Sequence, residues 1–155
     1  MFDVPIDAWY AWLGIAGMSL LTLGIAAGIP AGPTPDAMGV AGTIDRVAAS
    51  EYPATAEHGL AADQIRLTPN RISLRGPGGA TTAVLEFAPV TPARGDDRLY
   101  RVLKGEPPDR GFESPESFSQ VAAETRTQEP RWRSAPPRLR IRTVTWEGER
   151  VTLVG

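Results

Sequence analysis

Cysteine is absent from this sequence of 155 residues, and histidine occurs once, at His58. Without cysteine there is no disulfide framework, thiolate zinc site, iron–sulfur cluster or thiol nucleophile, and one histidine leaves most histidine metal sites incomplete. A P-loop is missing too, because RGPGGA at residues 75–80 lacks the Lys-Ser/Thr ending and reads as a turn. We therefore expect no metal, no other cofactor and no enzymatic activity.

Neither sign of charge dominates, because 16 basic residues oppose 18 acidic ones and the formal net charge is -2. This balance gives no electrostatic reason to expect nucleic acid as a partner. The mean hydropathy of -0.17 excludes a protein with several membrane spans. Since 42% of the residues are nevertheless hydrophobic, the apolar residues must be concentrated in part of the chain.

That part is the N-terminal segment, where residues 8–29 read AWYAWLGIAGMSLLTLGIAAGI without a charge. A helix of this length spans roughly 33 Å, enough for a hydrocarbon core of about 30 Å. Aromatic side chains suited to the membrane interface stand at its start, and prolines follow its end. The sequence predicts a transmembrane anchor helix within residues 1–29, with these interface aromatics: Trp9, Tyr10 and Trp12.

A cleaved secretory signal is the alternative interpretation of this segment. Signal peptides begin with a basic region, whereas this chain begins with Asp3 and Asp7, and no small-x-small cleavage site follows. We therefore favour an uncleaved anchor that remains in the bilayer.

The glycines of the anchor share one helical face. At 100° per residue they fall with one leucine inside an arc of about 80°, and Gly24 and Gly28 have GxxxG spacing. Such a stripe favours close packing against a partner helix or a second copy, although a lipid-facing stripe is the alternative, because glycine is common in membrane helices. The predicted seam consists of Gly14, Gly17, Leu21, Gly24 and Gly28.

The side of the membrane that holds the rest of the chain is weakly encoded. Orientation follows Lys and Arg near the span, and the first basic residue is Arg46. The acidic N-terminal tail favours an exterior N-terminus, whereas a pilin-like insertion places the C-terminal part outside. We expect a single-pass protein of the cell membrane with an extracellular body.

The remaining chain predicts a Pro-rich linker at residues 30–37 and one α+β domain at residues 38–155. Helical spacing covers 38–50, and alternating apolar residues predict strands at 64–68 and 71–75 and a third from 81 to about Pro89. Asp97 is a candidate cap for a helix at 98–104 that Gly105 stops, and Ser114 opens another that ends before Pro130. A hairpin around Glu147-Gly148 joins 138–146 to 150–154. The expected order is α-βββ-αα-ββ with an antiparallel sheet.

An arginine ladder is the most prominent candidate site. Three arginines alternate with Leu139 and Ile141, so a strand projects them from one face: Arg138, Arg140 and Arg142. Guanidinium groups bind oxyanions such as phosphate, anionic headgroups or acidic side chains. The alternative is a solvated strand face neutralised by the acidic stretch between Asp96 and Glu124.

Other candidates have simpler explanations. His58 lies in an expected polar loop before the sheet and lacks a second histidine. Helix capping by Ser114 accounts for the nearby Glu113 and Glu116 without catalysis. Trp132 and Trp146 suit a core or a strand pair better than a base-stacking platform.

Three segments carry a family resemblance: MFDVPIDAWYAWLG at the start, GTIDRVAASEYPAT after the linker, and PRWRSAPPRLRIRTVTWEGERVTLVG at the end. Together they resemble an uncharacterised haloarchaeal family of short single-pass membrane proteins. The resemblance implies association with type IV pilus-like or Tad-type secretion components. Because the start lacks a basic-Gly prepilin cleavage motif, the sequence favours an accessory component over a filament subunit.

Two functions from different classes remain open. The first is a non-enzymatic structural or accessory protein of a pilus-like or secretion assembly, with membrane lipid and membrane-protein partners. The second is a membrane-tethered binding or sensory domain that recognises an anionic ligand through the arginine ladder.

Overall fold

The computed structural model of the chain describes Leu13 and residues 32–155. At the C-terminal end, strands β7 (Arg138–Trp146) and β8 (Glu149–Val154) form the predicted antiparallel hairpin. The φ angles of 47° at Glu147 and 94° at Gly148 are positive, as a two-residue type I′ turn requires. The hairpin belongs to sheet A, whose order is β1-β7-β8-β5.

The predicted hairpin of residues 64–75 forms the centre of sheet B. Strands β2 (Gln64–Thr68), β3 (Arg71–Gly76) and β4 (Gly79–Val84) form an antiparallel meander, and β6 (Arg133–Ser134) adds to β2. The third strand stops at Val84, not near Pro89, because the Asp45 carboxylate accepts hydrogen bonds of 3.0 Å from the N–H groups of both Glu86 and Phe87. These groups are therefore satisfied by a helix side chain instead of by strand pairing.

Three α-helices occur among residues 32–155: α2 (Ala37–Ala48), α3 (Asp97–Leu103) and α4 (Pro115–Thr127). The cap of α3 is Asp96, not Asp97, because its extended backbone lets the carboxylate accept from the N–H groups of Arg98 and Leu99. Burial raises the pKa of Asp96, but these hydrogen bonds and the Arg98 charge outweigh it, so the pKa lies below its usual value. Gly105, with φ 118°, ends α3 as predicted.

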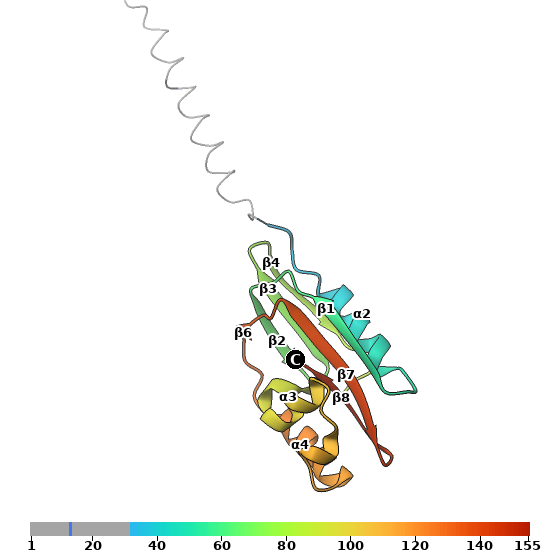
Figure 1. The fold of residues 1–155 in the computed structure, drawn as a ribbon. Coiled ribbons are helices and arrows are strands. Elements are labelled where there is room, and N and C mark those ends of the chain that lie inside the picture. Colours follow the sequence, from blue (N-terminus) through green and yellow to red (C-terminus); the bar gives the residue numbers. More distant parts are fainter. Residues whose placement is uncertain (1–12, 14–31) are drawn as a thin grey trace, which may run out of the picture. The chain divides into compact units, whose positions relative to one another are not determined.

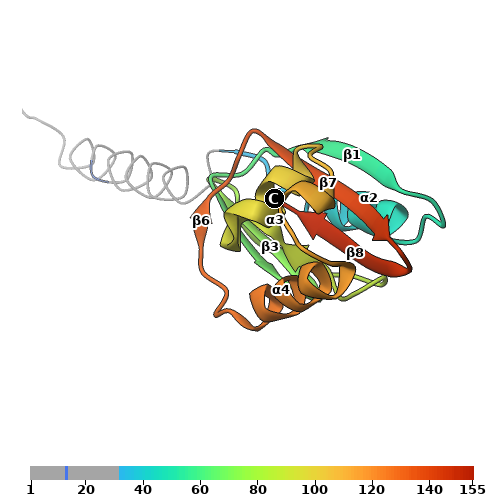
Figure 2. The same cartoon turned by 60° about the horizontal axis from the view of Figure 1, so that its bottom comes forward.

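Each face of sheet A packs against a different set of elements. Leu139 and Ile141 of β7 join α2 and the inner face of sheet B in one core, whereas Val144 and Leu153 join α3 and α4 in a second core around Phe118. Figures 1 and 2 show α2 on one side of sheet A and the other two helices on the opposite side. The alternation of side chains along β7 thus assigns its residues to two cores.

The arrangement of strands differs from the predicted one. Strands β1 (Ala54–Gly59), β5 (Thr91–Pro92) and β6 were not expected, the strands form two sheets, and β5 runs parallel to β8. β1 contains His58, which therefore lies in a strand and not in a loop. Its sequence ATAEHG has no large apolar residue to mark it. It is a strand because each of its residues pairs with one of residues 138–143 of β7.

The end of the predicted linker packs against the β3–β4 turn. Thr34 donates to the carbonyl of Gly78 over 3.3 Å, Thr81 donates to the carbonyl of Pro35 over 2.6 Å, and Pro35 is buried. A Cβ on Gly78 would lie 2.4 Å from the carbonyl oxygen of Gly32, so only glycine permits this approach. Residues 32–36 are therefore part of the folded body, and Figure 1 shows them beside the β3–β4 turn.

The predicted anchor lies outside the described residues except for Leu13, and so do the seam glycines and the interface aromatics. Within the residues that the structure describes, none of the helices combines the length and the hydropathy required to traverse a bilayer.

Candidate functional site

The arginine ladder lies on the face of sheet A that α3 partly covers. Arg138, Arg140 and Arg142 project from the same side of β7 as the core residue Val144, because successive side chains of a strand alternate. The prediction that the three arginines share a face is confirmed. A cleft of about 340 Å³ opens between this face and the end of α3.

Glu57 on β1 is the counter-ion of two ladder residues. Its carboxylate accepts from Arg140 Nε over 2.9 Å and lies 3.5 Å from Arg138 Nη1, and β1 pairs with β7 so that Glu57 stands directly opposite Arg140. The hydrogen bond from Arg140 and its positive charge hold the pKa of Glu57 below its usual value. Burial opposes this effect, and Arg138 adds to it. Because both arginines share one carboxylate, an excess positive charge remains.

Arg142, the third ladder residue, caps a helix. Its Nη1 donates to the carbonyl of Val102 in the last turn of α3 and to that of Glu106 just after the helix. Helix C-termini carry unsatisfied carbonyls and a partial negative charge, which a guanidinium group stabilises. Arg142 therefore fixes α3 on the sheet and is less free than its neighbours to bind a ligand.

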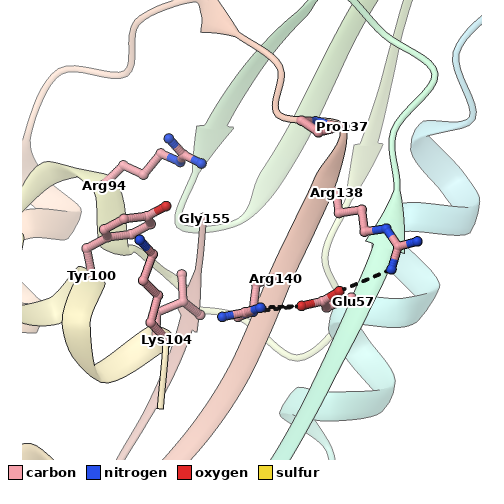
Figure 3. Close-up of a pocket in the computed structure, with 9 residues that line it drawn as sticks. Glu57, Arg94, Tyr100, Lys104, Pro137, Arg138, Arg140 and Gly155 are labelled. Atoms are coloured by element: carbon pink, nitrogen blue, oxygen red, sulfur yellow. Dashed lines mark hydrogen bonds and ion pairs between the residues drawn. The ribbon is translucent and has the colours of Figure 1, made fainter. Parts of the chain in front are cut away.

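Two further cations form the opposite wall of the cleft. Arg94, from the 3₁₀ turn η1 (Ala93–Gly95), has its Cζ 5.0 Å from the centre of the Tyr100 ring, and Lys104 has its Nζ 4.6 Å from the same ring. Figure 3 shows this trio on one side of the cleft and the row of Arg138, Glu57 and Arg140 on the other. The aromatic ring holds both cations near the cleft without neutralising them.

The basic character continues into a neighbouring cavity of about 310 Å³, which shares Arg94 and adds Arg131 and Arg133 against one acidic residue, Glu129. Burial lowers the pKa of Arg133, and the positive charge of Arg94 lowers it further. Positive charge is thus concentrated in one region of a chain whose net charge is -2. Such a region attracts anionic groups.

Comparison with known families adds one result. The model of DUF7283, a family of unknown function, matches residues 3–144. The chain belongs to this family. No curated protein and no solved structure matches the chain.

In this DUF7283 chain, the counter-ion of the ladder differs from the predicted one. The acidic stretch from Asp96 to Glu124 was the expected source, but Asp96 and Glu106 pair with Arg98 and Arg101 of α3 instead. Glu57 is not among the predicted residues, because nothing in ATAEHG marks a strand. No local pattern could have found it, since β1 is defined by its pairing with the distant β7.

The remaining candidates serve the fold. Thr43 donates to the carbonyl of Gly39, and its oxygen lies 2.8 Å from His58 Nδ1, so the histidine ties β1 to α2. Trp146 packs 6.3 Å from Phe118 in the second core, and Trp132 stacks with the guanidinium groups of sheet B. Among residue 13 and residues 32–155, no group of three His, Asp or Glu side chains is placed to hold a metal ion.

Proposed function

We propose that this chain is a non-enzymatic, single-pass membrane-anchored accessory protein of an archaeal pilus-like or secretion assembly. The observation that carries the proposal is the uncharged apolar segment of residues 8–29, long enough to cross a bilayer. The non-enzymatic part rests on the sequence, which has no cysteine and one histidine.

Residues 32–36, here called the docked connector, support a structural role. Since Thr34 and Pro35 are hydrogen-bonded to the β3–β4 hairpin, the chain leaves the domain from a fixed point. Residues 32–36 are therefore part of the surface that the folded body can present to a partner protein.

The glycine face of the anchor is the proposed contact with other membrane helices. Replacing Gly24 and Gly28 together by Leu fills the groove that lets helices approach closely, and we expect co-purification with membrane partners to be lost. Ala26→Leu adds bulk on the opposite helical face and is the matched control. Unchanged association in the glycine variant would overturn the packing role.

The proposed extracellular position of the body has its own test. A tag placed after Gly155 is followed by immunoblotting while protease is added to intact and to lysed cells. Digestion in intact cells agrees with an external domain and with a pilus-like context. Protection until lysis would instead place the body inside the cell and would contradict the proposed pilus-like context.

Recognition of an anionic ligand through Arg138, Arg140 and Arg142 is the alternative function. The observation that favours it is the cleft beside the ladder, where Arg94 and Lys104 add two cations. Ligand binding would then weaken with salt and disappear when the ladder charges are reversed. Binding that persists in the reversed variant would exclude this function.

A further inference from the structure

The cations of the cleft are not fully neutralised. Among residues 32–155, ion pairs join Arg98 to Asp96 and Arg101 to Glu106, and Glu57 serves both Arg138 and Arg140. No carboxylate of this part of the chain pairs with Arg94 or Lys104. Four cationic side chains line the cleft, against the carboxylate of Glu57 and the backbone carboxylate of Gly155, the last residue of the chain. The excess is therefore two positive charges.

We propose that this cleft binds a phosphate-type oxyanion between Arg94 and Lys104 on one wall and Arg138 and Arg140 on the other. The proposal rests on the anion-binding alternative given above and not on the membrane anchor. The proposed ligand contacts more than the ladder. It lies in the space between β7 and α3, next to the unpaired cations Arg94 and Lys104.

The chemistry of the walls favours phosphate over a single carboxylate. A phosphate monoester carries about two negative charges at neutral pH and offers three terminal oxygens, so it can accept from both walls at once. Guanidinium groups match its geometry with paired N–H donors, and an ammonium group adds a compact charge. A carboxylate offers only two oxygens and one charge.

The volume and the lining indicate that the phosphate carries an organic substituent. A cleft of about 340 Å³ lies within the range of small-molecule sites and exceeds the size of one phosphate group. Leu103, Pro137 and the Tyr100 ring supply apolar surface next to the cations. A phosphate ester, whether a free metabolite or a lipid headgroup, therefore fits both kinds of lining.

Glu57 has a specific part in this arrangement. In the unliganded cleft it neutralises Arg138 and Arg140, and a phosphate entering between the walls must compete with it for the same N–H donors. Removing its charge without changing its shape should therefore tighten binding. If the ion pairs of Glu57 only stabilise the fold, removing its charge should instead destabilise the domain and leave the ligand affinity unchanged.

The test is isothermal titration calorimetry on the full-length chain in a neutral detergent. The probes are inorganic pyrophosphate and dihexanoyl phosphatidic acid, with zwitterionic dihexanoyl phosphatidylcholine as the control lipid. The test variant combines Arg94→Gln with Lys104→Gln. The matched control combines Arg98→Gln with Arg101→Gln, which removes the same charge from exposed side chains of α3 that already have carboxylate partners.

We expect at least one of the two phosphate probes to bind, with a Kd that rises at least about tenfold in the Arg94/Lys104 variant and changes little in the control. Glu57→Gln should lower the Kd by roughly fivefold, because it removes a negative charge that repels the phosphate at close range in a solvated site. Preference for pyrophosphate identifies a soluble ester as the natural source. Preference for phosphatidic acid identifies a lipid headgroup.

Three results would overturn the proposal. The first is failure of both phosphate probes to bind, and the second is an equal loss of affinity in the test and control variants. The third is binding of an oligo-aspartate peptide without binding of either phosphate probe. That last result would reject phosphate while leaving recognition of an anionic partner intact, so the two failures are distinguishable.

Discussion

At the scale of single residues, two glycines of α2 have opposite requirements. Gly42 is exposed, and a Cβ built on it would meet nothing within 4 Å, whereas a Cβ on Gly39 would lie 2.2 Å from Asp36 Oδ2. Asp36 caps the helix by accepting from the Gly39 N–H over 2.8 Å. The side chain at position 39 thus decides whether the cap can form.

We expect Gly42→Ala to raise the free energy of unfolding by about 1 kcal/mol, because alanine loses less conformational entropy in a helix. Gly39→Ala gains the same propensity but displaces the Asp36 carboxylate, which costs about 1 kcal/mol, so its net change is near zero. Urea denaturation followed by circular dichroism measures both. Equal stabilisation by the two substitutions would show that the cap contributes nothing.

Gly78 is the residue on which the docked connector depends. A methyl group there would lie about 2.5 Å from the backbone of Pro33, and backbone atoms cannot rotate away as a side chain can. We expect Gly78→Ala to destabilise the domain by about 1–3 kcal/mol and to expose residues 32–36 to protease. Gly59→Ala is the control, since a Cβ there has open space. A connector that stays protected in Gly78→Ala would contradict this account.

At the scale of secondary-structure elements, Phe118 is the largest side chain that α4 buries. Phe118 is completely buried, lies edge-on to Phe112 at 5.1 Å between ring centres, and also contacts Trp146 of β7. Phe118→Ala should lower the free energy of unfolding by about 3–5 kcal/mol, because it removes buried area and leaves a cavity. Phe87, which is 51% exposed, supplies the control, with an expected loss below about 1 kcal/mol. Similar losses in both variants would show that the second core does not stabilise the domain.

The elements that were predicted correctly share a local signal. The hairpin of β2 and β3 has alternating apolar residues and a Pro69-Asn70 turn, and α4 has its Ser114 cap, whose hydroxyl accepts from the Ser117 N–H. β1, in contrast, has small and polar residues and depends on β7, which lies about 80 residues further along the chain. No local signal can reveal such a strand, because its hydrogen-bond partners come from tertiary structure.

At the scale of the whole molecule, acidification should weaken the fold. The pKa of Glu57 is lowered by Arg140 and Arg138, and that of Glu116 by its own N–H and the Ser114 hydroxyl. Arg94 and Lys104 also face Glu57 across the cleft. A carboxyl group whose pKa is lower in the folded state stabilises the fold at every pH above its ordinary pKa. This contribution is lost as the pH falls through the lowered pKa.

We therefore expect the Tm of the full-length protein to be constant near neutral pH and to fall once the pH drops below about 4.5, the ordinary value for glutamate. Glu57→Gln removes one titrating group and should make this fall smaller. Thermal unfolding measured between about pH 7 and about pH 3 provides the comparison. A Tm that does not change across this interval would contradict the expectation.

The sequence by itself determined the features that depend on neighbouring residues. These are the α+β class, the Ser114 cap of α4, the Gly105 stop of α3, the terminal hairpin, and the shared face of Arg138, Arg140 and Arg142. All of them follow from backbone preferences and from the two-residue period of a strand. Membership of DUF7283 also follows from the sequence alone.

Only the tertiary structure decided how these pieces meet. It divides the strands into two sheets, brings Glu57 opposite Arg140, and places Arg94 and Lys104 across the cleft from the ladder. These pairings join residues far apart in the chain, so they depend on which surfaces bury the most apolar area together and not on any local pattern. The physical reason is that the charge of a site is a sum over space, whereas a sequence gives only its order along the chain.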